Sequence, residues 1–322
     1  MAFDEAIFSQ YGPKYLTNNV DWGNANHRRC IAASLVKGVS ILERDRQQKR
    51  QGPNALAPPW WESFHFILDH ILTDKDRSIS GAIYKYKFPD HYNQNPPKYV
   101  IAFRGTILKR KSMSQDLKLD LLVILNGLRN SSRFRIGLQA VQNIVDINNR
   151  VCDIWLAGHS LGAAIALLIG KDMVKLGTRL ETYLFNPPFS SLPLEKIKIN
   201  WLKHGLRRAR SEAIALLANT MSTSDNDGTF AKLYDWTPYL FVNPSDPICS
   251  EYIGYFEYMK KMVESGADEI ARIEAQNSLR SLFATAIGKE SEPSQYLPSA
   301  CVVTNLSTLA SARLLSKRDQ SL

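Results

Sequence analysis

One short segment combines a serine with the glycine spacing that nucleophilic catalysis uses. The segment from Gly158 to Gly162 reads Gly-His-Ser-Leu-Gly, and it lies between an apolar run, Ile154 to Ala157, and small and aliphatic residues from Ala163 to Leu168. This layout is typical of a nucleophile elbow, in which a buried strand turns sharply into a helix and holds a serine hydroxyl above the sheet edge. Glycines on both sides leave room for the strained turn. Ser160 is therefore the candidate nucleophile, and the alternative is a turn that only packs.

A serine hydroxyl is a poor nucleophile at neutral pH and needs a base, usually a histidine that a carboxylate orients. In a sheet with this elbow, the chain order is serine, then acid, then histidine. Asp246 fits the acid, because it follows the apolar run Tyr239 to Asn243 and lies between two prolines that fix the turn. The alternative is an aspartate that only shapes this turn.

Two backbone amides are candidates for an oxyanion hole. Leu161 comes directly after the nucleophile, and Thr106 follows the apolar run that ends in Phe103-Arg-Gly. Amide donors at these places would stabilise the charge that forms on an attacked carbonyl, and Thr106 could add its hydroxyl. For Arg104 we favour a structural role, as an ion-pair partner of Asp116 or Asp120.

The apolar patterns predict the elements that would position these residues. Unbroken apolar runs indicate strands that are buried on both faces, and strand, helix and strand around the elbow form a right-handed βαβ unit with parallel strands. Alternating positions predict a half-buried strand over Gly81 to Phe88. The other predicted strands are Lys98 to Thr106, Ile154 to Ala157, Glu181 to Asn186 and Tyr239 to Asn243, and the predicted helices include His27 to Gln48, an aromatic-rich segment from Trp60 to Leu72 with its aromatics in the core, Ile136 to Asn148 and Asp268 to Ile287.

One domain over residues 27–301 is expected to carry this sheet, preceded by an N-terminal extension, 1–26, and followed by a C-terminal tail, 302–322. The character of the chain changes over about residues 189–236, where basic residues, an apolar helical piece and a Ser/Asp/Asn/Gly link follow one another. An insertion between two core strands would form a helical cap over the sheet edge. The alternative is a peripheral pair of helices that gates nothing.

The composition is that of an ordinary soluble globule, with 44% apolar and 22% charged residues. No apolar run approaches the roughly 20 residues of a membrane span, and the N-terminal residues lack the pattern of a secretory signal. We therefore expect an intracellular, cytoplasmic protein. The four cysteines lie far apart without a C-x-x-C pair, which predicts reduced core residues in place of a zinc site or disulfides. No metal or organic cofactor is indicated.

The net charge of +9 raises the question of an anionic partner. The positive charge is spread over several separate clusters, and no nucleic-acid recognition motif accompanies them. We therefore expect no nucleic-acid binding, and at most a weak attraction to acidic membrane surfaces.

Three motifs are specific as a set: Phe-Arg-Gly-Thr from Phe103, Gly-His-Ser-Leu-Gly from Gly158, and Val-Asn-Pro-Ser-Asp from Val242. Together they resemble the class 3 (fungal-type) lipase family of α/β-hydrolases. The closer resemblance is to a plant branch often labelled GDSL esterase/lipase-like, although no Gly-Asp-Ser-Leu occurs here, and Ala57 to Trp61 and Leu297 to Ala300 resemble that branch too. The resemblance covers most of residues 27–301. It implies a mostly parallel central sheet with helices on both faces, a helical cap insertion, and cleavage of carboxylic esters.

One departure from the family concerns the base. The resemblance implies a catalytic histidine just before Leu297, but Gln295 and Tyr296 stand there. A glutamine amide has no basic lone pair at neutral pH and cannot take the serine proton. His204, in the predicted cap, is the one plausible stand-in. All six histidines precede Asp246: His27, His65, His70, His91, His159 and His204.

Two functions follow from these observations. The first is a serine carboxylic-ester hydrolase that acts on a lipid or other small acyl ester through an acyl-enzyme at Ser160. The second is a catalytically impaired pseudo-lipase that binds an acyl ligand or a protein partner, and Gln295 favours it. Loss of one triad member would leave roughly a thousandfold acceleration from the oxyanion hole and binding.

Overall fold

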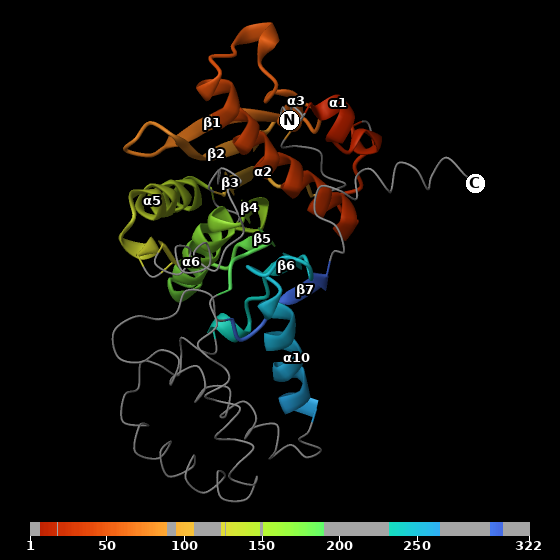
Figure 1. The fold of residues 1–322 in the computed structure, drawn as a ribbon, viewed down its shortest axis with the longest axis vertical. Helices are drawn as coiled ribbons and strands as arrows, with labels where there is room; N and C mark the ends of the chain where they lie inside the picture. The colour runs from red at the N-terminus through yellow and green to blue at the C-terminus, as the bar shows by residue number, and fades with distance from the viewer. Residues whose placement is uncertain are drawn as a thin grey trace, which may run out of the picture.

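The computed structural model of the protein describes residues 7–17, 19–88, 95–105, 124–125, 127–148, 151–189, 232–264 and 297–304. In these ranges seven strands form one sheet, and their order across the sheet is their order along the chain (Figure 1). The strands are β1 (Phe66–Thr73), β2 (Ile79–Tyr86), β3 (Tyr99–Phe103), β4 (Ile154–His159), β5 (Glu181–Phe185), β6 (Tyr239–Val242) and β7 (Cys301–Thr304). The α-helices are α1 (Phe8–Tyr11), α2 (Ala25–Gln47), α3 (Pro59–Glu62), α5 (Ser132–Ile147), α6 (Leu161–Lys175) and α10 (Glu251–Glu264). Short 3-10 helices are η1 (Lys14–Leu16), η2 (Gly52–Asn54), η3 (Leu128–Asn130) and η4 (Val151–Asp153).

The sheet is mostly parallel. β1, β2 and β3 pair antiparallel, and from β3 to β7 each strand is parallel to the next. Phe103 lies beside Gly158, and Phe185 lies between His159 and Phe241 in neighbouring strands. The carboxyl ends of β3, β4, β5 and β6 therefore meet at one edge of the sheet, the edge where open α/β sheets bind ligands. The predicted mostly parallel sheet is confirmed.

The central strands contribute to two separate cores. In β4, Trp155 and Ala157 pack on the side of α2, whereas Ile154 and Leu156 pack on the side of α5 and α6. All four residues are buried. A strand that is covered on both faces has no solvent side for polar residues, which explains the unbroken apolar run in the sequence. The predicted helices on both faces are confirmed, and Figure 1 shows α2 across the sheet from α5 and α6.

Helix α2 is anchored near both of its ends. Near its start, Arg28 Nη1 lies 3.0 Å from Glu181 Oε1 at the beginning of β5. Near its end, Glu43 Oε2 accepts a hydrogen bond of 2.9 Å from the Ile79 amide at the beginning of β2. The helix predicted over His27 to Gln48 is confirmed, and it starts two residues earlier.

The helix predicted over Trp60 to Leu72 is wrong beyond its first turn. α3 ends at Glu62, the backbone of His65 is in the left-handed region with a φ of 61°, and β1 begins at the next residue. β1 pairs with β2 from Phe66, which lies opposite Tyr86. This ladder of backbone hydrogen bonds, formed with a strand further along the chain, overrides the local helical pattern. The aromatic residues of the segment are buried, as predicted: Trp60, Trp61, Phe64 and Phe66.

Two other elements differ from the sequence-based expectation. The strand predicted over Gly81 to Phe88 forms as β2, but its residues are buried on both faces apart from the partly exposed Lys85, because α2 covers one face and Ile83 packs into the core on the other. Helix α10 is not predicted by the sequence pattern. The helix expected over Asp268 to Ile287 lies outside the described residues.

Both ends of the described chain contribute to the sheet and its core. Phe8, Leu16 and Trp22, all within residues 1–26, are buried in the core on the α2 side. At the other end, β7 continues to Thr304 and is parallel to β6. The segment before the expected domain therefore packs against it, and the sheet extends past residue 301.

Most of the expected cap, residues 190–231, lies outside the described residues. At its end, Leu233 and Trp236 are buried in the core on the α6 side, and the Trp236 indole donates a hydrogen bond of 2.9 Å to Leu180 O. This end of the segment therefore packs against the sheet domain.

Three of the four cysteines have described side chains, and all three are free thiols. Cys249 is buried and Cys30 is half-buried. Cys301 is exposed, so the expectation of four core residues is wrong there, because the face of β7 is only partly covered.

Candidate active site

Ser160 stands on a strained turn between β4 and α6. Its φ of 52° and ψ of −123° lie outside the regions that residues with a side chain normally adopt. Its amide donates a hydrogen bond of 2.9 Å to Phe185 O, which ties the turn to β5. Serine is a favoured helix N-cap, yet the Ser160 side chain makes no capping hydrogen bond to α6. The backbone of a nucleophile elbow is therefore present, with a hydroxyl that the helix does not use.

The two glycines of the elbow allow backbone segments to meet directly. A Cβ at Gly158 would overlap the carbonyl oxygen of Gly162. A Cβ at Gly162 would overlap the carbonyl oxygen of Phe103, at the end of β3. Since neither neighbour is the end of a flexible side chain, neither can move aside cheaply. The ends of β3 and β4 and the start of α6 are thus packed backbone against backbone.

The residue after Arg104 extends this contact. A Cβ at Gly105 would lie 2.9 Å from His159 O and 3.0 Å from Ser160 Cβ, so the chain that leaves β3 runs against the elbow. Leu161, the other oxyanion candidate, is the first residue of α6, and its amide belongs to the first turn, where no intrahelical acceptor exists. Thr106 lies outside the described residues.

Asp246 follows β6 at the same edge of the sheet as Ser160. Its Oδ1 accepts a hydrogen bond of 3.0 Å from the Ile248 amide, and its own amide donates one of 3.0 Å to Asn243 O. Asp246 does shape its turn, which is the alternative role that the sequence allowed. The Asp246 residue is partly exposed. β4 and β6 are two strands apart, so their ends lie about 10 Å from each other.

His159, the residue before Ser160, is a titratable group on which the charge of Asp246 acts. The pKa of His159 lies below its usual value because surrounding atoms desolvate the ring and because Lys37 brings a positive charge near it, while the charge of Asp246 acts in the opposite direction. The residue also remains in contact with solvent. The charge of Asp246 therefore influences the residue that precedes Ser160.

Lys37 is a residue that the sequence analysis missed. It comes from α2, and burial, followed by the charge of Arg44, lowers its pKa to about 8. The available signal was its place in the buried segment Leu35 to Val39, where it is the one charged residue. The charge of this lysine thus acts on His159 from α2, which covers the face of the sheet opposite to α6.

Several predicted residues cannot be placed. His204 and Gln295 lie outside the described residues, as do Asp116 and Asp120, the partners expected for Arg104. Among the described residues the carboxylate beside Arg104 is Glu43, with 3.9 Å between Arg104 Nη2 and Glu43 Oε1. The structural role favoured for Arg104 has its ion pair with a residue of α2.

Two general searches concern the same described part of the chain. Nowhere in it do three or more His, Cys, Asp or Glu residues gather so that they could hold a metal ion. None of its helices combines the length and the apolar character that crossing a bilayer requires.

A parallel sheet with a serine elbow at its carboxyl edge and an aspartate after a later strand defines an α/β-hydrolase. Comparison with known proteins gives the family. The family model "Lipase (class 3)" matches residues 124–190. A protein of Arabidopsis thaliana named "GDSL esterase/lipase At4g10955" is 45% identical over 320 residues, which cover 94% of this chain and 90% of that protein. The chain belongs to the class 3 lipase family, together with this plant relative.

Similar solved structures are esterases. A chain from a structural analysis of two fungal esterases of Rhizomucor miehei matches over 89% of this chain and 88% of its own length, with 12% identity and a TM-score of 0.35. The hyperthermophilic esterase of Pyrobaculum calidifontis matches over 94% and 97%, with 11% identity and a TM-score of 0.31. Carboxyl esterase 2 of Tuber melanosporum matches over 62% and 75%, with 15% identity and a TM-score of 0.30. With scores this low, the fold assignment rests on the sheet, the elbow and the family.

Proposed function

We propose that the protein is a serine carboxylic-ester hydrolase that acts on a lipid or another small acyl ester. The observation that carries this proposal is the left-handed backbone of Ser160, whose hydroxyl does not cap the helix that follows. Backbone strain of this kind costs of order 1–3 kcal/mol and is found where function needs it. The membership in a lipase family supports the same reaction class.

In the proposed reaction, Ser160 Oγ attacks the acyl carbonyl while a base takes its proton. The negative oxygen that forms is stabilised by the amide of Leu161 and by Thr106, and the loss of one such donor typically costs about 10²- to 10³-fold in kcat. The intermediate collapses, the alcohol leaves with the proton that the base held, and Ser160 keeps the acyl group. Water then attacks the acyl-enzyme while the base takes its proton, and the carboxylic acid leaves as that proton returns to Ser160. Asp246 orients the base and stabilises its protonated form.

The base distinguishes the two candidate functions. If His204 from the cap segment serves as the base, the triad is complete and the enzyme hydrolyses its substrate. With Gln295 in place of the family's histidine and no substitute, the protein is a pseudo-lipase that keeps the fold and binds an acyl ligand or a protein partner. The identity of residue 295 is the observation that favours this second candidate.

Labelling by a fluorophosphonate probe, together with hydrolysis of p-nitrophenyl butyrate, tests the proposal. We expect wild type and Ser245→Ala, an exposed serine at the same sheet edge, to label, and Ser160→Ala not to label. If His204 is the base, His204→Ala loses turnover. Labelling that persists in Ser160→Ala contradicts the proposal.

The second candidate makes a different prediction. A silent wild type whose turnover rises by about 10²-fold or more in Gln295→His establishes the pseudo-lipase, because positioned general bases contribute on that order. Cosedimentation with vesicles that contain phosphatidylserine tests the weak membrane contact proposed from the net charge of +9. Binding that survives 0.5 M salt would contradict an electrostatic attraction.

A further inference from the structure

Two Asn-Pro-Pro segments occur in the chain, and both begin with a left-handed backbone. The φ angle of Asn95 is 46° and that of Asn186 is 45°. Residues with a side chain rarely adopt a positive φ, and asparagine tolerates it better than most of them. Asn95 is exposed and precedes β3, whereas Asn186 directly follows β5 and is only 7% exposed. The same local conformation is therefore found in two different surroundings.

The peptide group before Asn186 joins the elbow to β6. Its carbonyl, Phe185 O, accepts a hydrogen bond of 2.9 Å from the Ser160 amide. Its N–H, on Asn186, donates one of 2.8 Å to Phe241 O. A peptide group is planar and trans, so its C=O and N–H point in opposite directions. This one group therefore bridges Ser160 and the strand that leads to Asp246.

The chain that follows Asn186 is held as well. The next two residues are prolines, which restrict φ at both positions. Phe189 is buried, its amide donates a hydrogen bond of 2.8 Å to Ile248 O, and its ring centroid lies 4.5 Å from that of Tyr252 in α10. The Ile248 amide in turn donates to Asp246 Oδ1 at 3.0 Å. The exit from β5 is thus connected to the turn that carries the proposed acid.

These contacts leave Asn186 little conformational freedom. Since the peptide group before it and Phe189 after it are both held, the φ and ψ angles of Asn186 set the direction between them. A residue that prefers a negative φ would displace one of the two held ends. A shift of the first end moves the acceptor of the Ser160 amide, and a shift of the second moves the turn of Asp246.

We propose that Asn186 is a positioning residue, whose left-handed backbone sets the place of Ser160 relative to Asp246. The inference rests on the proposed ester hydrolysis. Asn186 acts through the peptide groups on either side of it, and its side-chain amide takes no part in the reaction. Glycine, which adopts a positive φ freely, can therefore replace it.

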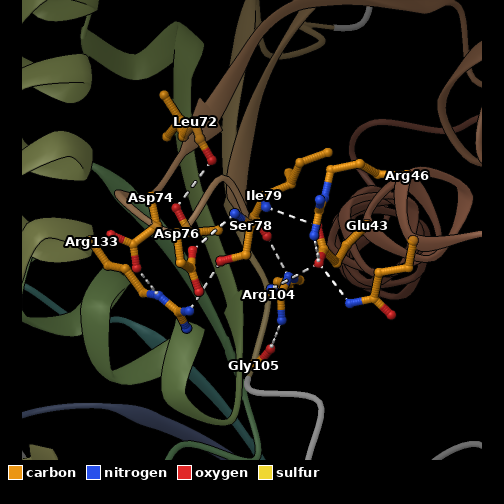
Figure 2. Close-up of polar contacts among 12 residues, drawn as sticks. Glu43, Arg46, Leu72, Asp74, Asp76, Ser78, Ile79, Arg104, Gly105 and Arg133 are labelled. Atoms are coloured by element: carbon orange, nitrogen blue, oxygen red, sulfur yellow. Dashed lines mark hydrogen bonds and ion pairs between the residues drawn. The ribbon is translucent and has the colours of Figure 1, made fainter.

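The loop after β3, on the other side of β4, has a different kind of support (Figure 2). There Arg104 Nη1 donates a hydrogen bond of 2.8 Å to Gly105 O, and Arg104 Nη2 lies 3.9 Å from Glu43 Oε1. Burial alone would raise the pKa of Glu43, but its hydrogen bonds, chiefly from Arg46 and the Ile79 amide, lower it to about 2. Charged side chains thus support the loop after β3, whereas the end of β5 depends on backbone conformation.

Two substitutions of Asn186 separate the backbone from the side chain, because both remove the carboxamide. Asn186→Gly keeps the freedom to adopt a positive φ, and Asn186→Ala does not. The matched controls are Asn95→Gly and Asn95→Ala, in the segment with the same three residues and nearly the same φ. For each protein we would measure kcat and KM for p-nitrophenyl butyrate, the rate constant of fluorophosphonate labelling, and Tm.

We expect Asn186→Ala to lower kcat and the labelling rate constant by about 10- to 100-fold with KM nearly unchanged, since small displacements of reacting groups have effects of this order. Asn186→Gly should stay within about threefold of wild type, because glycine reaches the same φ without a steric cost. Asn95→Ala should lower Tm for the same backbone reason but leave both rates within about twofold. Equal losses in Asn186→Gly and Asn186→Ala would assign the role to the carboxamide and overturn the inference. Wild-type rates in Asn186→Ala would overturn it too.

A readout that does not depend on activity separates this inference from the proposed function. In hydrogen exchange, peptides that contain the Ser160 or the Phe189 amide should exchange faster in Asn186→Ala than in Asn186→Gly, because the acceptors of these amides are displaced. The two Asn95 variants should show no such difference in these peptides. If wild type neither labels nor turns over, the proposed function fails, and the exchange still decides whether Asn186 positions the elbow. Equal exchange in the two Asn186 variants overturns the inference.

Discussion

The two sides of the active edge are built differently. On the side of β3 and β4, glycines bring backbone into contact with backbone around Ser160, and the buried Arg104 pairs with Glu43 and donates to the Gly105 carbonyl. On the side of β6, Asp246 sits in an Asn-Pro-Ser-Asp-Pro turn, fixed by hydrogen bonds within the turn and partly exposed. The proposed nucleophile is thus positioned by the main chain, whereas the carboxylate of the proposed acid is positioned by a hydrogen bond within its own turn.

This difference indicates which part of the machinery can change without loss of the fold. The described contacts that fix the strained elbow come from the backbone of β3, β5 and α6, and they involve no residue proposed as the base. A glutamine at position 295 is therefore compatible with an intact Ser160 elbow, and the geometry of the elbow alone does not report turnover.

The largest effect is expected from a substitution of Asp246, on the β6 side of the edge. Asp246→Asn should reduce kcat by up to about 10⁴-fold in an active enzyme, since an amide neither orients the base correctly nor stabilises its protonated form. The change keeps the size of the side chain, so Tm should move little. Steady-state kinetics and a thermal melt on the same sample check this. An Asn variant with unchanged kcat would remove Asp246 from the reaction.

The next largest effect is expected at Gly162, on the side where backbone packs against backbone. Gly162→Ala should destabilise the protein by about 1–3 kcal/mol or prevent folding, because the added methyl group overlaps the Phe103 carbonyl. Urea unfolding measures this. The control is Gly254→Ala in α10, where a Cβ meets nothing within 4 Å and alanine should be neutral or stabilising by up to about 1 kcal/mol. Equal unfolding midpoints for the two variants would contradict the close packing.

A third prediction concerns acid stability. The folded pKa of Glu43, about 2, lies below its ordinary value of 4.5. A group with a lowered folded pKa stabilises the fold fully above its ordinary pKa and loses that contribution as pH falls through the folded value. Urea midpoints should therefore fall between pH 4.5 and pH 2. The fall should be shallower in Glu43→Gln, and parallel curves for the two proteins would disprove the assignment.

The smallest expected effect concerns the pKa of His159, on which charges from both sides of the edge act. The charge of Lys37 lowers the pKa of His159, so Lys37→Met should raise it. Asp246→Asn should lower it further, because the carboxylate acts in the opposite direction. An NMR titration of the imidazole, with the signal assigned through His159→Gln, measures both shifts. Shifts of the opposite sign would mean that neither group lies near the elbow.

Local signals predicted much of the sheet and the elbow that carries Ser160. The elbow was visible because strand, glycines, serine and helix follow one another within a few residues, and β3, β5 and β6 were visible as apolar runs. Asp246 was found from its place after a strand and between prolines. Each of these depends on neighbours in the sequence, which is why the patterns were enough.

Features that depend on distant partners were not predictable. β1 was read as helix because its pairing with β2 has no trace in local periodicity. The partner of Arg104 was sought at Asp116 and Asp120, downstream of it, whereas Glu43 reaches it from a helix early in the chain. The charge of Lys37 likewise acts on His159 only because the fold packs α2 against β4. His204, Gln295 and Thr106 stay predictions.

Helix α2 contacts the beginning of β5 through Arg28, and it contacts Arg104 at the end of β3 through Glu43. The stretch that the lipase family model matches contains the elbow but not this helix. A recombinant fragment trimmed to residues 124–190 would therefore carry Ser160 without the helix that supplies Glu43 to Arg104, and mutational libraries for this protein should be spread over its first fifty residues as well as over the serine motif.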